Sequence, residues 1–505
     1  MVKSKRGGVI VSGIVSVLED ARLLGDGRIA LAGITSDSRS VREGDLFAAL
    51  RGERYDGHDF LDGAVRNGAV AVLVEEADAS IPITQIVVPD TRAIAGKVAD
   101  AFYGHPADAL SMIGVTGTNG KTTTTYLIDS ILQSAGIQSG LLGTISYRHG
   151  GKNITASHTT PEAIELHRHM REMVDEGATH CVMEVSSHAL AQRRVDGCAF
   201  TVGIFTNLTQ DHLDYHRTME SYSASKARLF DSLIAHDGWA VVNVDDRLGR
   251  EMVRGIPHRL LRYTLEGDGG EITVRRKHFT VDGIEAELDT PAGRVALSSP
   301  LIGEFNLSNI VAAVGCGIAL GLERGAIEEG ISSMGRVPGR LERVTSPHGF
   351  MVFVDYAHTG DALERVLKTL VAIKRGRIIT VFGCGGDRDR GKRPVMGEVA
   401  VRWSTLAIIT SDNPRGEDPL SIIAEIEAGM GGVRRHEAGE MAISGGYMVV
   451  PDRGEAIVKA VELAGEDDII LIAGKGHEDY QIVGDKRLPF DDRVELAKAL
   501  DARVR

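Results

Sequence analysis

Short apolar runs, each followed by a glycine-rich or charged segment, recur along this chain. In its last third, such runs occupy residues 351–354, 378–382, 406–410 and 469–473, and each leads directly into polar residues. Apolar runs of this length are typical of buried strands in a parallel sheet. Since ligands bind at the carboxyl ends of such strands, we expect one functional edge on this sheet.

The first hundred residues show the same alternation on a smaller scale. Apolar runs predict strands at residues 45–50, 69–75 and 85–89. Helix-periodic segments predict helices at residues 60–67 and 91–103. The pattern therefore indicates a small α/β unit at the start of the chain.

A glycine loop separates a strand from a helix in the second section of the chain. Residues 112–115 predict the strand, Gly117-Thr118-Asn119-Gly120 the loop, and Lys121-Thr122-Thr123 the first turn of the helix. Backbone N–H groups in such a loop attract phosphate, a lysine neutralises its charge, and a threonine can ligate Mg²⁺. The strict phosphate-loop pattern is not met, because Val115 stands where its first glycine belongs. We predict a nucleotide-binding loop in which Lys121 faces solvent.

Polar side chains also follow two further predicted strands. Glu184 lies at the end of an apolar run that begins at Cys181, and His212 follows the run at residues 202–205. At the carboxyl ends of neighbouring strands, both could face the glycine loop and hold a metal there. The carboxylate favours Mg²⁺, whereas histidine is commoner on zinc, and the two strand ends could also have unrelated duties. Lys226 reads as an ordinary helix lysine.

Length and composition divide the chain and exclude some functions. A chain of 505 residues is too long for one core, and we expect three domains at residues 1–108, 109–337 and 338–505. The net charge of −13 argues against a nucleic-acid partner. No apolar stretch reaches a membrane-spanning length, so we expect no membrane insertion.

The cysteines and the N-terminus bear on the compartment. The four cysteines lie far apart in the sequence without metal-type spacing, which predicts buried free thiols in a reducing compartment. The N-terminal apolar stretch is short and interrupted by Gly13, so we interpret it as a first structural element rather than a signal peptide. We therefore expect a cytoplasmic protein. We also expect it to be a monomer.

Together the motifs resemble the Mur ligases, the ATP-dependent enzymes that form amide bonds in peptidoglycan precursor synthesis. The resemblance covers the whole chain, from Asp37-Ser38-Arg39 to Gly474-Lys475-Gly476-His477-Glu478. The family's phosphate loop, G-x-T-G-T-N-G-K-T, is matched from Gly114 to Thr122. The resemblance implies an α/β protein of three domains: a small α/β UDP-binding domain, a central P-loop-type ATPase with a mainly parallel sheet, and a C-terminal Rossmann-like domain that binds the amino acid.

The resemblance also assigns site residues. It implies catalytic roles for Lys121, Glu184, His212 and Lys226, and a Mg²⁺ site built from Thr122, Glu184, His212 and carbamylated Lys226. The implied ATP contacts are Gly117, Thr118, Asn119, Gly120, Lys121, Thr122, Thr123, Asn306, Asn309, Arg340 and Asp355. Those for the UDP-muramoyl-dipeptide are Ser38, Thr159, Thr160, Ser186, Gln192 and Arg194. Those for diaminopimelate are Arg388, Asp412, Asn413, Pro414, Arg415, Gly474 and Glu478.

The reaction implied by the resemblance joins an amino acid to UDP-N-acetylmuramoyl-L-alanyl-D-glutamate. ATP phosphorylates the D-glutamyl carboxylate, and the amine of meso-diaminopimelate attacks the acyl phosphate. Arg415 offers a planar fork for the distal carboxylate of diaminopimelate, although it could instead pair with Glu417 or Asp418.

Three other functions remain open at this point. The same scaffold could use L-lysine. Relatives of folylpolyglutamate synthetase share the ATPase but lack a UDP-binding first domain, so residues 1–108 argue against them. A nucleotide-operated binding protein without ligase activity leaves the polar strand ends of the last section unexplained.

Overall fold

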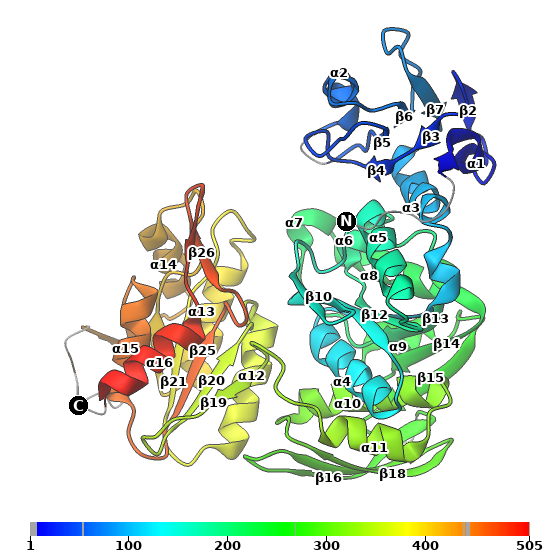
Figure 1. Ribbon diagram of the computed structural model, residues 1–505. Helices are drawn as coiled ribbons and strands as arrows, with labels where there is room; N and C mark the ends of the chain where they lie inside the picture. Colours follow the sequence, from blue (N-terminus) through cyan, green and yellow to red (C-terminus); the bar gives the residue numbers. More distant parts are fainter. Residues whose placement is uncertain (1–7, 53–54, 268, 438–439, 441–444, 504–505) are drawn as a thin grey trace.

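The computed structural model describes residues 8–52, 55–267, 269–437, 440 and 445–503. Three large sheets, formed by successive parts of the chain, carry the architecture (Figure 1). Helices lie against the sheets, and most strand pairs are parallel, which confirms the predicted α/β fold class. Among the described residues, no helix combines the length and apolar character needed to cross a bilayer.

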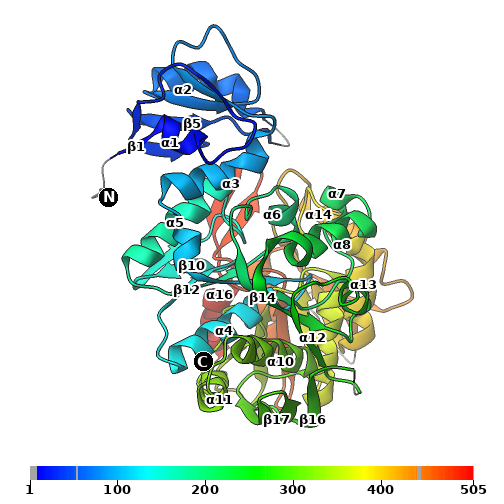
Figure 2. The ribbon, with the colours of Figure 1, turned by 90° about the vertical axis from the view of Figure 1, so that its right-hand side faces the viewer.

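The N-terminal sheet contains the strands predicted in the first hundred residues. Its order is β2 (Arg22–Leu24), β7 (Thr84–Val87), β6 (Ala71–Val74), β5 (Asp45–Ala48) and β4 (Gly33–Thr35). The strands β4 to β7 are parallel, and β2 runs antiparallel to β7. The predicted second helix is α3 (Thr91–Phe102), whereas the first begins as a 3₁₀ turn (Gly57–Phe60) before α2 (Leu61–Arg66). Figure 2 shows α3 between this sheet and the rest of the molecule.

The central sheet places the glycine loop at its middle. Its order is β11 (Lys152–Thr155), β10 (Ser146–His149), β9 (Ser139–Leu142), β12 (His180–Glu184), β8 (Ser111–Thr116), β13 (Phe200–Phe205), β14 (Ile234–Asn243), β15 (Arg259–Thr264), β16 (Ile272–Phe279), β17 (Ile284–Thr290) and β18 (Gly293–Ser299). Strand β8 lies between β12 and β13, and all three are parallel. The glycine loop, Glu184 and the segment before His212 therefore lie at one edge of the sheet.

Helices cover both faces of the central sheet. On one face, α4 (Lys121–Ser134), α10 (Glu304–Ala319) and α11 (Arg324–Ser332) enclose a core that includes Leu127, Val241 and Ile310. On the other face, α5 (Ala163–Asp175) packs with the segment after α8 (Met219–Arg228) around Met170 and Phe230. The central strands are buried from both sides, as their continuous apolar runs require.

The C-terminal sheet confirms the four strands predicted in the last third. Its order is β19 (Glu342–Val344), β20 (Met351–Asp355), β25 (Ile469–Ala473), β21 (Ile378–Phe382), β22 (Leu406–Ile409), β24 (Gly446–Val449) and β23 (Arg435–His436). The four predicted strands are adjacent and parallel. One face carries α12 (Gly360–Ile373), α13 (Lys392–Trp403) and α14 (Pro419–Glu427), and the other carries α15 (Arg453–Leu463) and α16 (Asp492–Arg503).

The cysteines agree with the sequence-based expectation. Cys181, Cys198, Cys316 and Cys384 are buried and free. Burial raises the pKa of the Cys181 and Cys384 thiols to about 12. These thiols are structural rather than reactive.

Candidate functional site

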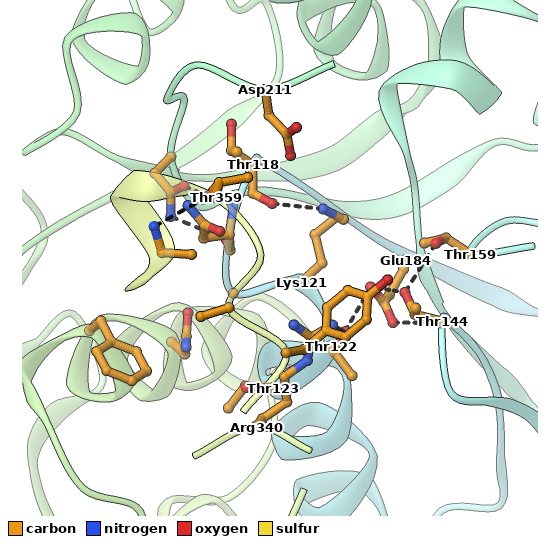
Figure 3. Close-up of a pocket in the computed structure, with 18 of the residues that line it drawn as sticks. Thr118, Lys121, Thr122, Thr123, Thr144, Thr159, Glu184, Asp211, Arg340 and Thr359 are labelled. Carbon is orange, nitrogen blue, oxygen red and sulfur yellow. Dashed lines mark hydrogen bonds between the residues drawn. The ribbon is translucent and has the colours of Figure 1, made fainter. Parts of the chain in front are cut away.

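A cavity of about 660 Å³ lies where the loops of the central and C-terminal sheets face each other. The glycine loop forms one wall, and Arg340, Asp355 and Thr359 come from the C-terminal part of the chain. Figure 3 shows the central residues, with Lys121 pointing back toward Thr118 and Glu184 lying between Thr122 and Thr144.

The glycines of the loop are required by close contacts. Gly117 has φ +148°, and a Cβ there would lie 1.9 Å from Thr206 Oγ1. Gly120 has φ +90°, and its Cβ would lie 2.2 Å from Asn309 Oδ1. Only glycine fits both positions, so the loop can turn sharply and present backbone N–H groups at the start of α4.

Lys121 is half-buried, so the prediction that it faces solvent is wrong. Its Nζ donates to Gly117 O (2.9 Å) and Thr118 O (3.0 Å). Burial lowers the pKa of this ammonium. The Lys121 side chain therefore folds back over its own glycine loop, on the wall of the cavity.

Glu184 and Thr122 place hard oxygen atoms side by side. The Thr122 hydroxyl donates to Glu184 Oε2 (3.0 Å), and Thr144 donates its backbone N–H to Oε1 (2.8 Å) and its hydroxyl to Oε2 (3.1 Å). Arg340 Nη2 donates to Thr122 Oγ1 (2.9 Å), so a guanidinium from the C-terminal part of the chain contacts the same hydroxyl. The buried carboxylate and the hydroxyl fit a site for Mg²⁺, which prefers oxygen ligands, and the guanidinium beside them fits an anion such as phosphate.

His212 lines the same cavity as Thr122 and Glu184. Its backbone adopts a left-handed conformation (φ 54°), and its ring packs edge-on against His188 at 4.8 Å. Desolvation lowers the pKa of His212 to about 4, although Asp211 opposes the shift. The imidazole is therefore neutral near pH 7, the form that ligates a metal.

Lys226 is not the ordinary surface lysine that its helix pattern indicates. Its side chain is 1% exposed, and Nζ donates to Gly117 O (2.8 Å) while lying 4.5 Å from the centre of the Tyr222 ring. Among the described residues, no carboxylate forms an ion pair with it. Desolvation, and then the neighbouring Lys121, lower the pKa of Lys226 well below its usual range. A buried amine with a lowered pKa therefore lies directly behind the glycine loop.

The residues predicted for the nucleotide and the dipeptide are not all exposed to the cavity. Thr159, Ser186, Arg194 and Asn309 line it, as do Arg340 and Asp355. Asn306 lies behind Asn309 and accepts its amide (3.2 Å). Asp355 accepts backbone N–H groups of Leu341 and Ala357, so its carboxylate orders the Arg340 turn.

Further residues support the wall from behind or lie elsewhere. The Thr160 hydroxyl donates to Glu184 O (2.7 Å), and Arg194 donates to Thr160 O (3.0 Å) and to Gln192. Ser38 lies in the N-terminal unit, where its carbonyl accepts from Asn67 (2.9 Å), and it lines neither of the two cavities.

A second cavity of about 790 Å³ adjoins the first. Most of the residues predicted for diaminopimelate line it: Arg388, Asp412, Asn413, Arg415, Gly474 and Glu478. Pro414 lies in the same loop but outside the wall. The two cavities share residues from both parts of the chain, namely His188, Asp211, His212, Tyr356, His358 and Arg388. A group bound in one cavity can therefore reach a group bound in the other.

A buried lysine organises the second cavity. Lys475 Nζ donates to Glu478 Oε2 (3.0 Å) and Asn413 Oδ1 (3.1 Å), and Asn413 Nδ2 donates to the same Glu478 oxygen (2.9 Å). The sequence pattern indicates no role for Lys475, although this lysine lies between Gly474 and Glu478. Its complete burial is a tertiary property that the local pattern does not reveal.

Arg415 does not form the local ion pair considered as an alternative. Its Nη1 donates to Gly386 O (2.8 Å). Glu417 instead pairs with Arg393 (2.7 Å), and Asp418 caps the start of α14. The Arg415 guanidinium is thus held at the cavity wall by backbone carbonyls, and the described residues provide no carboxylate for it.

Asp361 joins the two halves of the site, a contact that the sequence did not suggest. Its Oδ2 accepts from Asn119 Nδ2 (3.1 Å) and from Thr209 Oγ1 (3.1 Å). The start of α12 is therefore hydrogen-bonded to the glycine loop of the central sheet.

Comparisons with known proteins agree with these features. Three family profiles match: "Mur ligase family, catalytic domain" over residues 30–112, "Mur ligase middle domain" over 115–317, and "Mur ligase, glutamate ligase domain" over 339–476. Curated relatives named UDP-N-acetylmuramoyl-L-alanyl-D-glutamate--2,6-diaminopimelate ligase include one from Geobacter metallireducens, 53% identical over 96% of this chain and 97% of the relative. Another, from Geobacter sulfurreducens, is 51% identical over 96% of this chain and 97% of the relative. A solved structure of a ligase with the same name is 33% identical, with a TM-score of 0.69 over 99% of this chain and 100% of that one.

Proposed function

This chain belongs to the Mur ligase family, and on that premise we propose that it joins meso-2,6-diaminopimelate to UDP-N-acetylmuramoyl-L-alanyl-D-glutamate. The reaction consumes ATP and forms an amide bond at the D-glutamyl carboxylate during peptidoglycan precursor synthesis. The near-complete coverage of relatives that carry this name supports the assignment. We also propose a cytoplasmic location, because the reaction consumes ATP.

One observation carries the proposal: the first cavity, at the glycine loop, and the second cavity, at Arg388 and Arg415, share a wall. The first holds groups suited to a polyphosphate, and the second holds groups suited to an amino acid with a distal carboxylate. A carboxylate activated at the shared wall, beside His212 and Arg388, lies within reach of an amine from the second cavity. A binding protein that only responds to nucleotide needs no second cavity at this place.

The first half-reaction transfers the γ-phosphate of ATP to the D-glutamyl carboxylate. One P–O bond breaks at the γ-phosphorus and another forms to the carboxylate oxygen, which leaves ADP and an acyl phosphate. Two anions approach each other, so the site must mainly neutralise charge and hold both reactants in line. Lys121 and the backbone N–H groups in the first turn of α4 bind the phosphates, and Arg340 adds positive charge from the C-terminal domain.

The residues present fit Mg²⁺ at this place. Thr122 and Glu184 would hold it through adjacent oxygen atoms, with His212 as a neutral imidazole ligand. Bound Mg²⁺ would neutralise the charge that develops on the transferred phosphoryl group. Thr144 holds the Glu184 carboxylate in place through both of its oxygen atoms.

Lys226 has the properties that a lysine needs for carbamylation. Its lowered pKa favours the unprotonated amine, which can attack CO₂; an N–C bond forms, one C=O π bond is lost, one proton is released, and the product is a carboxylate-like anion. Such an anion beside Lys121 would supply a further oxygen ligand for Mg²⁺. The amine is buried with one carbonyl as its hydrogen-bond partner, so no ion pair has to be broken.

The second half-reaction joins the amine to the acyl phosphate and releases inorganic phosphate. The attacking amine must lose a proton, and its N–C bond forms as the bond to phosphate oxygen breaks. Arg415 binds the distal carboxylate of diaminopimelate, while Asn413 and Glu478 receive its ammonium. L-Lysine has no distal carboxylate and leaves the Arg415 charge uncompensated, which disfavours it.

The remaining assignments concern the precursor. Thr159, Ser186 and Arg194 hold the dipeptide at the first cavity, with Thr160 and Gln192 supporting them. Ser38 contacts the UDP end in the N-terminal unit. We divide the chain into a UDP-binding domain at residues 1–108, an ATPase domain at 109–337 and an amino-acid-binding domain at 338–505.

Product analysis tests the proposal directly. The protein is incubated with ATP, Mg²⁺, UDP-N-acetylmuramoyl-L-alanyl-D-glutamate and either meso-diaminopimelate or L-lysine, and products are identified by mass spectrometry. We expect ADP release that requires the precursor, and a tripeptide product with diaminopimelate. ADP release without any condensed product would favour the nucleotide-operated binding protein, and equal turnover of L-lysine would refute the choice of amino acid.

A further inference from the structure

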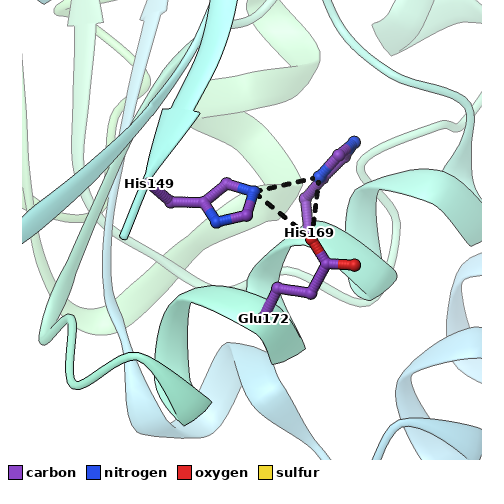
Figure 4. A group of neighbouring side chains, drawn as sticks. All are labelled: His149, His169 and Glu172. Carbon is purple, nitrogen blue, oxygen red and sulfur yellow. Dashed lines mark hydrogen bonds and ion pairs between the residues drawn. The ribbon is translucent and has the colours of Figure 1, made fainter. Parts of the chain in front are cut away.

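We infer that His149, His169 and Glu172 form a binding site for a divalent transition-metal ion, zinc foremost, apart from the catalytic cavities. The three side chains converge on one point (Figure 4). His149 ends β10, and His169 and Glu172 lie one turn apart on α5. None of the three lines either cavity. The site ties the β10–β11 hairpin to the helix that packs beside it.

The distances among the ligand atoms suit a zinc ion. His149 Nε2 lies 3.3 Å from His169 Nδ1 and 3.4 Å from Glu172 Oε2, and the last two atoms are 3.7 Å apart. A point equidistant from these three atoms lies about 2.0 Å from each, which matches zinc–nitrogen and zinc–carboxylate bonds. Two imidazoles and one carboxylate are typical of zinc and other late transition metals, whereas Mg²⁺ prefers oxygen alone.

The hydrogen bonding of His149 favours a cation at that point. Its Nδ1 lies 2.7 Å from Glu176 Oε2, and since a carboxylate only accepts, Nδ1 must carry the proton. In the neutral ring Nε2 then carries a lone pair, which faces the Glu172 carboxylate at 3.4 Å. These two electron-rich atoms repel each other at this distance, and a cation bound between them removes the repulsion. A carboxylate behind a metal-binding histidine is also the usual supporting arrangement.

Burial and charge around the site agree with a bound cation. The His149 side chain is fully buried, His169 is 1% exposed, and Glu172 is 15% exposed, so a metal can enter from the Glu172 side. Arg168 contacts the other oxygen of Glu172, Oε1, and leaves Oε2 to the site. Three carboxylates (Glu165, Glu172, Glu176) face two cations (Arg168, Lys152) around the histidines, so the surroundings carry net negative charge.

A metal here would stabilise the loop that carries the dipeptide contacts. Tyr147, two residues before His149, packs edge-on against the His169 ring at 5.1 Å. Its hydroxyl donates to His158 O (2.6 Å), directly before Thr159 and Thr160. A metal that fixes the two histidines therefore also fixes the support of this loop. The role is structural, and the ion takes no part in the proposed phosphoryl transfer.

Metal-binding measurements on matched variants test the inference. The chelator-stripped full chain is kept in excess Mg²⁺, which occupies the oxygen site at Glu184, and is titrated with Zn²⁺. The variants are Glu172→Gln, which removes a ligand, and Glu176→Gln, which removes the supporting carboxylate. Asp175→Asn is the control, because it makes the same charge change on α5 in an exposed pair with Arg171. Zinc content, circular dichroism and the visible spectrum of Co²⁺ in place of Zn²⁺ are recorded.

We expect one zinc equivalent per wild-type chain that Glu172→Gln fails to retain. Glu176→Gln should bind it about 10–100-fold more weakly, the usual effect of losing such a supporting group. Asp175→Asn should bind as the wild type does. Equal zinc content in the wild type and folded Glu172→Gln would overturn the inference.

Hydrogen exchange on the wild type decides the question without any variant. Zn²⁺ should slow exchange in peptides covering residues 146–176, and Co²⁺ should show absorption bands of a site with imidazole ligands. Protection confined to the peptides around Glu184 and His212 would show that zinc binds the oxygen site instead, and would also overturn the inference. Neither result depends on catalytic activity.

Discussion

Replacement of Arg415 by methionine tests how the protein selects its amino acid. Methionine keeps the length of the stem but removes the charge and the fork of donors. The Arg415 backbone is held independently of the side chain, because its N–H donates to Ile482 O (3.1 Å) and its carbonyl accepts from Gly484 (2.8 Å). The left-handed conformation at this residue (φ 51°) imposes the same strain on any side chain of this kind. We therefore expect the loop to keep its shape.

The expected loss of kcat/KM in Arg415→Met follows from the contacts that the Arg415 guanidinium can make. One nitrogen, Nη1, is held by Gly386 O, so the remaining donors can bind a carboxylate in the second cavity. Two charge-assisted hydrogen bonds contribute about 1.5–3 kcal/mol each. Their loss lowers kcat/KM for meso-diaminopimelate by about 10²–10⁴-fold, since each 1.4 kcal/mol is tenfold. L-Lysine makes neither bond and is disfavoured by the uncompensated charge of Arg415, so its slow turnover should not fall and should rise as that charge is removed.

The assay compares initial rates of phosphate release with the two amino acids. Arg415→Lys keeps the charge but not the fork and should fall between the wild type and Arg415→Met. Arg402→Met is the matched control, because Arg402 pairs only with Glu398 on the exposed face of α13 among the described residues. An equal loss of rate with both amino acids would show that Arg415 supports the loop rather than the distal carboxylate. In either case, a folded variant whose ratio of rates with meso-diaminopimelate and L-lysine equals that of the wild type would refute the reasoning.

Three further predictions concern the nucleotide side of the site. Lys121→Ala should abolish ADP formation while the near-ultraviolet circular dichroism stays unchanged, because Lys121 contacts only carbonyls of its own loop; near-normal turnover would contradict its role at the phosphates. Lys226→Ala should be nearly inactive and regain part of its rate in acetate, which supplies the missing carboxylate; a fully active variant would return Lys226 to an ordinary helix residue. Asp361→Ala removes the hydrogen bonds to Asn119 and Thr209, worth about 1 kcal/mol each, and the ion pair with Arg365 on the same helix, so KM for ATP should rise about tenfold or more. The same Asp361→Ala protein should keep its melting temperature within a few degrees. An unchanged KM for ATP would show that the contact between α12 and the glycine loop does not matter for ATP binding.

The strands at the sites were predictable because their signal is local. Residues 351–354 and 469–473 are apolar throughout and end at polar loops, so their burial and their functional edge both follow from the pattern. The structure confirms that they are neighbours in one parallel sheet. The outer strands β16 to β18 were not predicted, although β17 and β18 alternate in burial as one-faced strands do, with Ile284, Ala286 and Leu288 of β17 inward. Charged residues on their exposed face keep these strands from forming a continuous apolar run, which is the easier signal to read.

Contacts between distant segments were beyond the reach of local patterns. Lys226 lies on a helix with a weak apolar face, and nothing in residues 219–228 shows that Gly117 lies against it. Asp361 likewise reads as an acidic residue in the first turn of a helix, where such residues are common. Its contact with Asn119 joins residues 242 positions apart in the sequence. For Lys226 only the family resemblance indicated a role.

Lys121 and Lys226 at the glycine loop explain why the site needs two anions, the phosphate of ATP and a carbamate on Lys226. Lys121 and Lys226 both direct Nζ at Gly117 O, from 2.9 and 2.8 Å, so one carbonyl serves two amines. Like charges at this distance disfavour full protonation of the pair, and desolvation acts in the same direction on both pKa values. Phosphate bound at Lys121 and a carbamate formed on Lys226 relieve the same shortage of negative charge. The low pKa that weakens Lys226 as a cation is also the property that makes it a nucleophile toward CO₂, so its burial is a condition of the chemistry that we propose for it.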